Sequence, residues 1–198
     1  MVRRSWHTCQ PIDLHRIAKE YFLAAKRIEL QGLAQVLGIS RATAYRWAGS
    51  AEQLVGEVVA SLIEDSVNKL AEQTRSTSTG SDRIASILSS LLEESRTLMA
   101  LNSYLRHNPK QGLKVVASDH GPVRHKTAAI IEALLEAEIE NGNLTLNASA
   151  PATASLLTRL LETFLYSDTI VNEQPDSGHL VDMVKTILSE PVPAKAAS

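Results

Sequence analysis

Hydroxyl, guanidinium and phenol groups are concentrated in one short run of the chain, from Ser40 to Ser50. Hydroxyl and guanidinium groups bind phosphate oxygens, a guanidinium fork also binds the edge of guanine, and a methyl group can contact that of thymine. The candidate contact residues in this run are Ser40, Arg41, Ala42, Thr43, Ala44, Tyr45, Arg46 and Ser50. Their types predict a surface that binds the phosphates and base edges of nucleic acid.

The elements that must position these groups are two short helices joined by a glycine turn. Leu33, Val36 and Leu37 have the spacing of an inward helix face, and Gly38 follows where the chain needs a positive φ to end that helix. Ser40 can cap the next helix by accepting a hydrogen bond from a backbone N–H two or three residues later. Helix, glycine turn and capped helix predict a helix-turn-helix, whose second helix enters the DNA major groove.

This stretch resembles the TetR family of transcriptional regulators. The resemblance is carried by Leu33-Ala34, Gly38-Ile39-Ser40, Thr43-Ala44-Tyr45-Arg46-Trp47, Gly49-Ser50 and Glu52-Gln53-Leu54. Two positions depart from the family pattern: Ala51 stands where a lysine is usual, which removes a phosphate contact, and Lys26 stands where a glycine is common. The chain as a whole also resembles quorum-signal and lactone-responsive members of the QsdR type.

The charge distribution agrees with a DNA-binding head. The net charge is −2, but residues 1–50 hold eight of the 20 Lys and Arg residues and only three of the 22 Asp and Glu residues. A basic head on an acidic body directs one face of the protein toward phosphate. Arg3 and Arg4 precede this head in a terminal arm that has no periodic pattern.

Composition favours a cytoplasmic protein outside the membrane. The single cysteine, Cys9, excludes an internal disulfide and fits a reducing compartment. No apolar run approaches the roughly 20 residues needed to span a bilayer. Apolar residues make up 44% of the chain with few aromatics, so we expect a core of Leu, Ile, Val and Ala.

Helical periodicity extends over nearly the whole chain and predicts an all-α fold of about nine helices. Pro11 begins a first helix with an inward stripe that includes Ile12, Ala18 and Phe22. Ser50 and Gln53 form a capping box for a helix that keeps its apolar spacing through Leu70. Further helices are expected after a cap at Ser81, near 113–117, after Gly121-Pro122, after Pro151 and from 177 to 190; a break between Ser95 and Thr97 is left open.

The chain divides, on this interpretation, into a flexible arm at 1–10, a three-helix DNA-binding domain at 11–50, a helical ligand-binding and dimerisation domain at 51–190, and a disordered tail at 191–198. The resemblance implies a homodimer that pairs through its last two helices and binds a palindromic operator. It also implies a small-molecule pocket in the middle helices and no cofactor. Candidate lining residues are Leu88, Leu91, Met99, Tyr104, His107, Thr163, Phe164 and Tyr166. This mostly aliphatic set suits an acyl chain or a lactone.

Two other classes of function are weighed against a ligand-released repressor. His107, His120 and His125 with Asp119 suggest a metal-dependent enzyme, but a Gly-Pro break separates them and a spacing of five does not align two ligands on one helix face. No phosphate loop or nucleophile elbow is present, so we expect no enzyme and no metal. A helical interaction module without DNA binding is the other alternative, suggested by Ala51.

Overall fold

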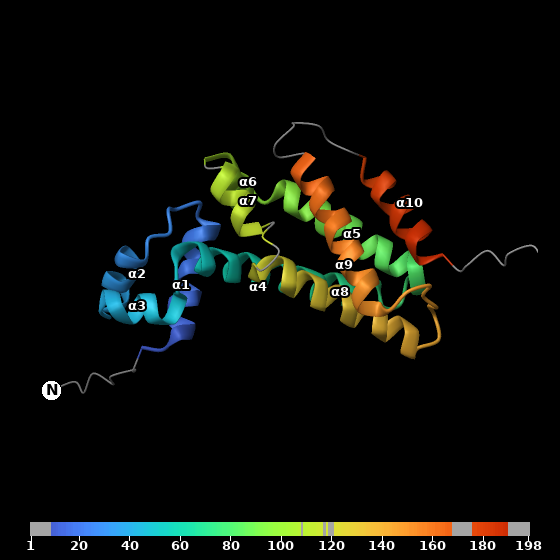
Figure 1. Ribbon diagram of the computed structural model, residues 1–198, viewed down its shortest axis with the longest axis horizontal. Helices are drawn as coiled ribbons and strands as arrows, with labels where there is room; N and C mark the ends of the chain where they lie inside the picture. Colours follow the sequence, from blue (N-terminus) through green and yellow to red (C-terminus); the bar gives the residue numbers. More distant parts are fainter. Residues whose placement is uncertain (1–8, 108, 117, 119–120, 168–175, 190–198) are drawn as a thin grey trace, which may run out of the picture. The chain divides into compact units, whose positions relative to one another are not determined.

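The computed structural model describes residues 9–107, 109–116, 118, 121–167 and 176–189 (Figure 1). The predicted all-α fold is confirmed, because these residues form helices and no strand. The helices of the described residues are α1 (Pro11–Leu23), α2 (Leu30–Leu37), α3 (Arg41–Ala48), α4 (Ala51–Thr74), α5 (Gly80–Thr97), α6 (Met99–His107), α7 (Pro109–Val116), α8 (Pro122–Glu140), α9 (Ala150–Tyr166) and α10 (Ser177–Leu188). They number one more than the approximate count expected, because Leu98 takes an extended conformation and separates α5 from α6.

The chain forms two compact units. The first unit comprises residues 1–59 and 99–123, and the second comprises residues 60–98 and 124–198. The continuous helix α4 therefore contributes its first part to one unit and its remainder to the other. Among the described residues, no helix combines the length and the apolarity that crossing a bilayer requires.

The first unit contains the three-helix head, in which α1 packs against α2 and α3 (Figure 1). The inner stripe of α1 consists of Leu14, Ala18 and Phe22, each no more than 2% exposed. These residues repeat every four positions and so stay on one helix face. Ile12, predicted in this stripe, is 65% exposed instead. On α2, Val36 was also expected inside but is exposed.

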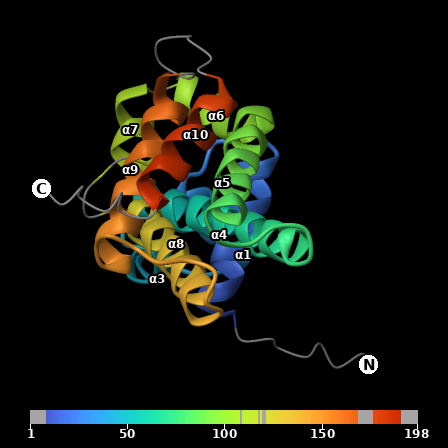
Figure 2. The ribbon, with the colours of Figure 1, turned by 90° about the vertical axis from the view of Figure 1, so that its right-hand side faces the viewer.

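The second unit has one aliphatic core. The α10 helix packs along α5 and α9, and Figure 2 shows these three helices together. The fully buried side chains of this core include Ile84 and Leu88 of α5, Ile131 of α8, Leu157 of α9 and Leu180 of α10. Burial of such side chains stabilises the unit by about 1.5–3 kcal/mol each relative to exposure, so the core fixes which helix faces remain at the surface.

Candidate nucleic-acid interface

The turn between α2 and α3 depends on one glycine. Gly38 has φ of 66°, a left-handed conformation that residues with a Cβ rarely adopt. Its N–H donates to the carbonyl of Gln35 at 3.2 Å, and the next N–H, of Ile39, donates to Ala34 at 3.0 Å. These two bonds satisfy the last carbonyls of α2 and turn the chain toward α3. The predicted helix-ending glycine is confirmed.

The first turn of α3 is capped by Ser40. The Ser40 Oγ accepts a hydrogen bond from the Thr43 backbone N–H at 3.0 Å, and its hydroxyl also bonds the Thr43 Oγ1 at 2.8 Å. Gly49, with φ of 69°, ends the helix and donates its N–H to the Tyr45 carbonyl at 2.8 Å. The predicted cap at Ser40 is confirmed, and α3 is a short, well-delimited helix of eight residues.

The outward face of α3 carries four of the candidate contact residues. Arg41, Ala42, Tyr45 and Arg46 are exposed, and the Arg41 guanidinium lies 5.4 Å from the centroid of the Tyr45 ring. Stacking a cation on an aromatic face restricts both side chains and so organises this surface before any partner arrives. Ala44 must be corrected: it is fully buried, because it lies on the opposite face of α3, against the head's core.

A second group of candidate contacts lies where α4 begins. The Ser50 Oγ accepts a hydrogen bond from the Gln53 N–H at 3.1 Å, which confirms one half of the predicted capping box. The residue that follows, Ala51, offers no positive charge, and the first turn of α4 also contains the acidic Glu52, so the groups here that can bind an anion are backbone N–H groups at the positive end of the helix dipole. Those groups suit a phosphate oxygen.

The candidate ligand residues do not form one cluster. Leu88, Leu91 and Phe164 belong to the core of the second unit, where each is at most 7% exposed. Tyr104 belongs to the first unit, and its ring lies 5.9 Å from that of Phe22. Burial, and to a smaller extent the charge of Glu52, raises the pKa of Tyr104. The side chains of His107 and Tyr166 lie outside the part of the chain that is described.

Two predicted lining residues are corrected by their exposure. Met99 is 78% exposed, because the extended Leu98 starts a new helix whose phase does not continue that of α5. Thr163 is exposed on α9, and its hydroxyl donates to the carbonyl of Arg159 at 2.9 Å. Neither side chain lines an interior site.

Sequence reasoning missed two buried polar groups of α8. The Thr127 hydroxyl on α8 is buried and has no hydrogen-bond partner among the described residues. Glu138, also on α8, is 1% exposed and accepts hydrogen bonds from three residues. Nothing in the sequence marked Thr127. Glu138, in contrast, continues the stripe of Ile131 and Leu135, and a charge in such a stripe indicates a buried pair.

The described residues contain no group of three His, Cys, Asp or Glu side chains that could hold a metal ion. Of the residues that suggested a metal site, His125 is exposed on α8. Asp119, His120 and the side chain of His107 lie outside the described residues.

Comparison with known proteins identifies the fold. A family model described as the tetracyclin repressor-like C-terminal domain matches residues 79–189. The transcriptional repressor QsdR of R. erythropolis, from the TetR family, has a similar structure, with a TM-score of 0.84 and 23% identity over 90% of this chain and 93% of that one.

Two further structures are similar at lower identity. The repressor AlkX of Dietzia sp., implicated in n-alkane biodegradation, has a TM-score of 0.64 at 16% identity and covers 92% of this chain and 98% of its own. Thermus thermophilus FadR, in complex with lauroyl-CoA, has a TM-score of 0.62 at 13% identity and covers 93% of this chain and 98% of its own. No curated protein matches this sequence significantly.

Proposed function

Because this chain belongs to the TetR family of regulators, we propose that it is a transcriptional repressor that leaves its operator when a small apolar effector binds its helical body. The observation that carries the proposal is the outward display of Arg41, Tyr45 and Arg46 on a capped helix that follows a glycine turn. A helix presented in this way fits the major groove of duplex DNA. The DNA-binding domain is assigned to residues 11–50 and the regulatory domain to 51–190.

Each outward group of α3 has a contact suited to its chemistry. Arg41 binds a phosphate or the N7 and O6 atoms of guanine, and Ala42 contacts a thymine methyl. Thr43, Tyr45 and Arg46 bind phosphates. Ser50 and the backbone N–H groups after it bind a further phosphate, which offsets the missing charge at Ala51.

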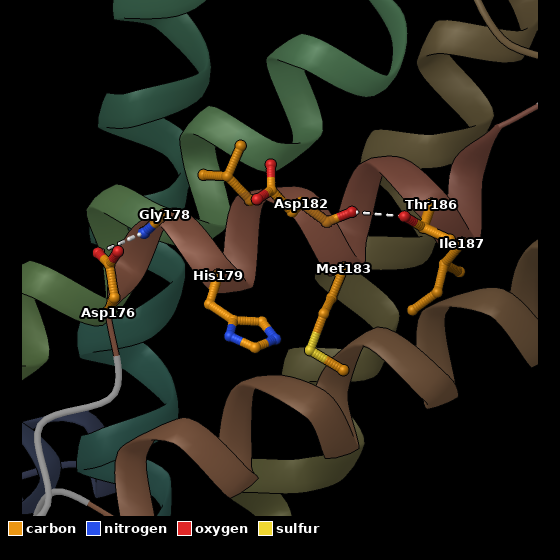
Figure 3. Close-up of a pocket in the computed structure, with 8 residues that line it drawn as sticks. Asp176, Gly178, His179, Asp182, Met183, Thr186 and Ile187 are labelled. Atoms are coloured by element: carbon orange, nitrogen blue, oxygen red, sulfur yellow. Dashed lines mark hydrogen bonds between the residues drawn. The ribbon is translucent and has the colours of Figure 1, made fainter.

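Pairing through α9 and α10 provides the second copy of this helix that a palindromic operator needs. Large apolar side chains remain exposed on both helices: Leu156 is 50% exposed and Met183 is 39% exposed. An open groove of about 710 Å³ runs along α10 beside Met183 and His179 (Figure 3). The His179 ring lies edge-on to Phe164 of α9, at 6.2 Å between centroids. A second copy of the chain covers this face, whose lining combines Val181, Met183 and Ile187 with polar groups such as Asp182 and Thr186.

A charge placed on that face is expected to dissociate the dimer. Leu156→Glu and Met183→Glu should each shift the protein to monomer in sedimentation analysis and weaken operator binding, because each buries an unpaired carboxylate at the interface. Ile139→Glu is the matched control, since Ile139 is 40% exposed on α8, outside these two helices. A dimer that persists in both variants would exclude α9 and α10 as the pairing surface.

The effector is assigned to the acyl-chain or lactone class. The core of the second unit is aliphatic, and Leu88, Leu91 and Phe164 are the candidate residues that belong to it. The buried hydroxyl of Thr127 is a hydrogen-bond donor for one polar atom of an otherwise apolar molecule. The lauroyl-CoA complex of FadR and the alkane association of AlkX support the same class, with no residue carried over.

The function is tested by titrating the full-length protein against labelled DNA from upstream of its own coding region. Binding should weaken by about a thousandfold between 50 and 200 mM salt if roughly six phosphates are neutralised. Lauroyl-CoA or an acylated lactone should then release the DNA, and free coenzyme A should not. Affinity no greater than for random-sequence DNA would favour the alternative, a helical interaction module without operator binding.

A further inference from the structure

The end of α8 and the start of α5 meet at one buried carboxylate of the second unit. Glu138, near the end of α8, is 1% exposed. It accepts hydrogen bonds from the Gly80 N–H at the start of α5 at 2.6 Å, from the Asn143 amide at 3.1 Å and from the Arg83 guanidinium. These three donors approach the carboxylate from different directions, so together they fix the position of its two oxygen atoms.

Arg83 extends this arrangement to the end of α4. Its Nη1 donates to Glu138, its Nη2 donates to the Ala71 carbonyl at 2.8 Å, and its Nε lies 3.4 Å from the Thr74 Oγ1. Ala71 and Thr74 form the last turn of α4. One guanidinium fork therefore connects α4 to α5 and α8, and the side chain is only 14% exposed.

Gly80 indicates how closely these segments approach one another. It has φ of 56°, and a Cβ built there would lie 2.4 Å from the Asn143 carbonyl oxygen. The backbone of α5 thus touches the loop that follows α8 at a separation that only glycine permits. A contact this close fixes the start of α5 against the loop after α8, and Arg83, which contacts the end of α4, lies one turn into α5.

We propose that Arg83, oriented by Glu138, is a positioning residue that holds the C-terminal end of α4 in place and thereby sets operator affinity without touching DNA. This inference rests on the proposed function, and it uses the continuity of α4, which contributes to both units. With Ala71 and Thr74 fixed, any displacement of α4 that effector binding causes would be confined to the part of the helix before Ala71. Arg83 then anchors the C-terminal end of α4 while the rest of the helix responds to the effector.

The role proposed for Arg83 requires its planar guanidinium group and not only its positive charge. Lysine at this position keeps a positive charge beside Glu138 but has one compact ammonium group, which does not reproduce a planar fork directed at three acceptors. Arg83→Lys should therefore keep Glu138 neutralised and release the end of α4. Thr74→Val removes the acceptor of the Arg83 Nε and leaves the pair of Arg83 and Glu138 intact, and it also removes the bond that the Thr74 hydroxyl donates to the Leu70 carbonyl within α4.

Amide hydrogen exchange of the full-length protein, without DNA, measures the hold on α4. Exchange in residues 67–74 should be about tenfold faster in Arg83→Lys, which loses the two contacts of Arg83 with α4, and at least about threefold faster in Thr74→Val, which loses one of them together with a bond inside α4. The matched control is Arg124→Lys, which weakens a bidentate pair with Glu162 of similar burial between α8 and α9. It should leave exchange in residues 67–74 unchanged.

Operator affinity, measured where every variant is folded and dimeric, supplies the second readout. Arg83→Lys should lower it by about threefold or more, and Arg124→Lys should not change it. Equal effects of the two substitutions would reduce Arg83 to a general stabilising residue, and unchanged exchange in Arg83→Lys and Thr74→Val would overturn the proposal. If the unaltered protein binds no operator, the proposed function fails, and the exchange comparison still decides whether Arg83 holds α4.

Discussion

Tyr45→Ala and Arg41→Ala are each expected to weaken operator binding by about tenfold to a hundredfold while the dimer persists. A contact to a base edge or a phosphate contributes about 1–3 kcal/mol, and every 1.4 kcal/mol corresponds to a tenfold change in affinity. Each substitution also removes one partner of the stacked pair, in which the Arg41 guanidinium lies 5.4 Å from the Tyr45 ring. Fluorescence anisotropy with labelled operator measures the loss.

Conservative substitutions distinguish the roles of these two residues. Arg41→Lys keeps the charge, so a large loss in this variant indicates a bidentate contact with guanine and a small one indicates a phosphate. Tyr45→Phe keeps the ring and removes only the hydroxyl. Lys69→Ala is the control, because it removes one exposed positive charge from the second unit. Unchanged affinity in both alanine variants would remove α3 from the DNA interface.

Glu138→Ala is expected to lower the free energy of unfolding by about 3–5 kcal/mol, the largest stability change we predict for a single substitution. The substitution leaves Arg83 almost buried without its counter-charge, and it leaves the Gly80 N–H without its acceptor. Both losses are of the kind that breaking one side of a buried pair produces. Urea denaturation, monitored by circular dichroism, measures the change in unfolding free energy. A loss below about 1 kcal/mol would contradict the prediction.

The same carboxylate gives stability a defined dependence on pH. Burial raises the pKa of Glu138, but hydrogen bonds from Gly80, Arg83 and Asn143 together lower it by more than burial raises it. The pKa therefore lies below its ordinary value of 4.5. The ionised form is therefore favoured in the folded state, and its contribution is present above pH 4.5 and lost as the pH falls through the folded-state pKa. The difference in unfolding free energy between the unaltered protein and Glu138→Gln should shrink below about pH 4.5. A difference that stays constant from pH 7 to pH 3 would exclude this role.

The helix-turn-helix could be predicted from sequence because its determinants are local. Gly38 ends α2 through its own positive φ, and Ser40 caps α3 three residues away. The predicted cap at Ser81 was wrong for the opposite reason. The α5 helix begins at Gly80, and the acceptor for its first N–H is Glu138, which lies 58 residues further along the chain. No pattern around residue 81 contains that information.

Helix phase explains the other differences between expectation and structure. On α1 the choice between Ile12 and Leu14 depends on which face meets α2 and α3, and apolar character alone does not distinguish the two residues. The extended Leu98 interrupts the phase between α5 and α6, so the stripe that includes Leu91 does not continue to Met99. A ligand site built from several helices depends on which face each of those helices turns inward. Sequence periodicity predicts the inward face of each helix separately and does not predict how the faces combine.

Only one side chain of α3, that of Ala44, is fully buried. The residues that face outward contribute little to the folding of the head, so under the proposed function their identities can change with the operator sequence. A library that varies Arg41, Ala42, Tyr45 and Arg46 around a constant Ser40 and Ala44 should consequently yield folded proteins with new target sites. Operator specificity could then be changed by surface substitutions alone, with the core of the head left as it is.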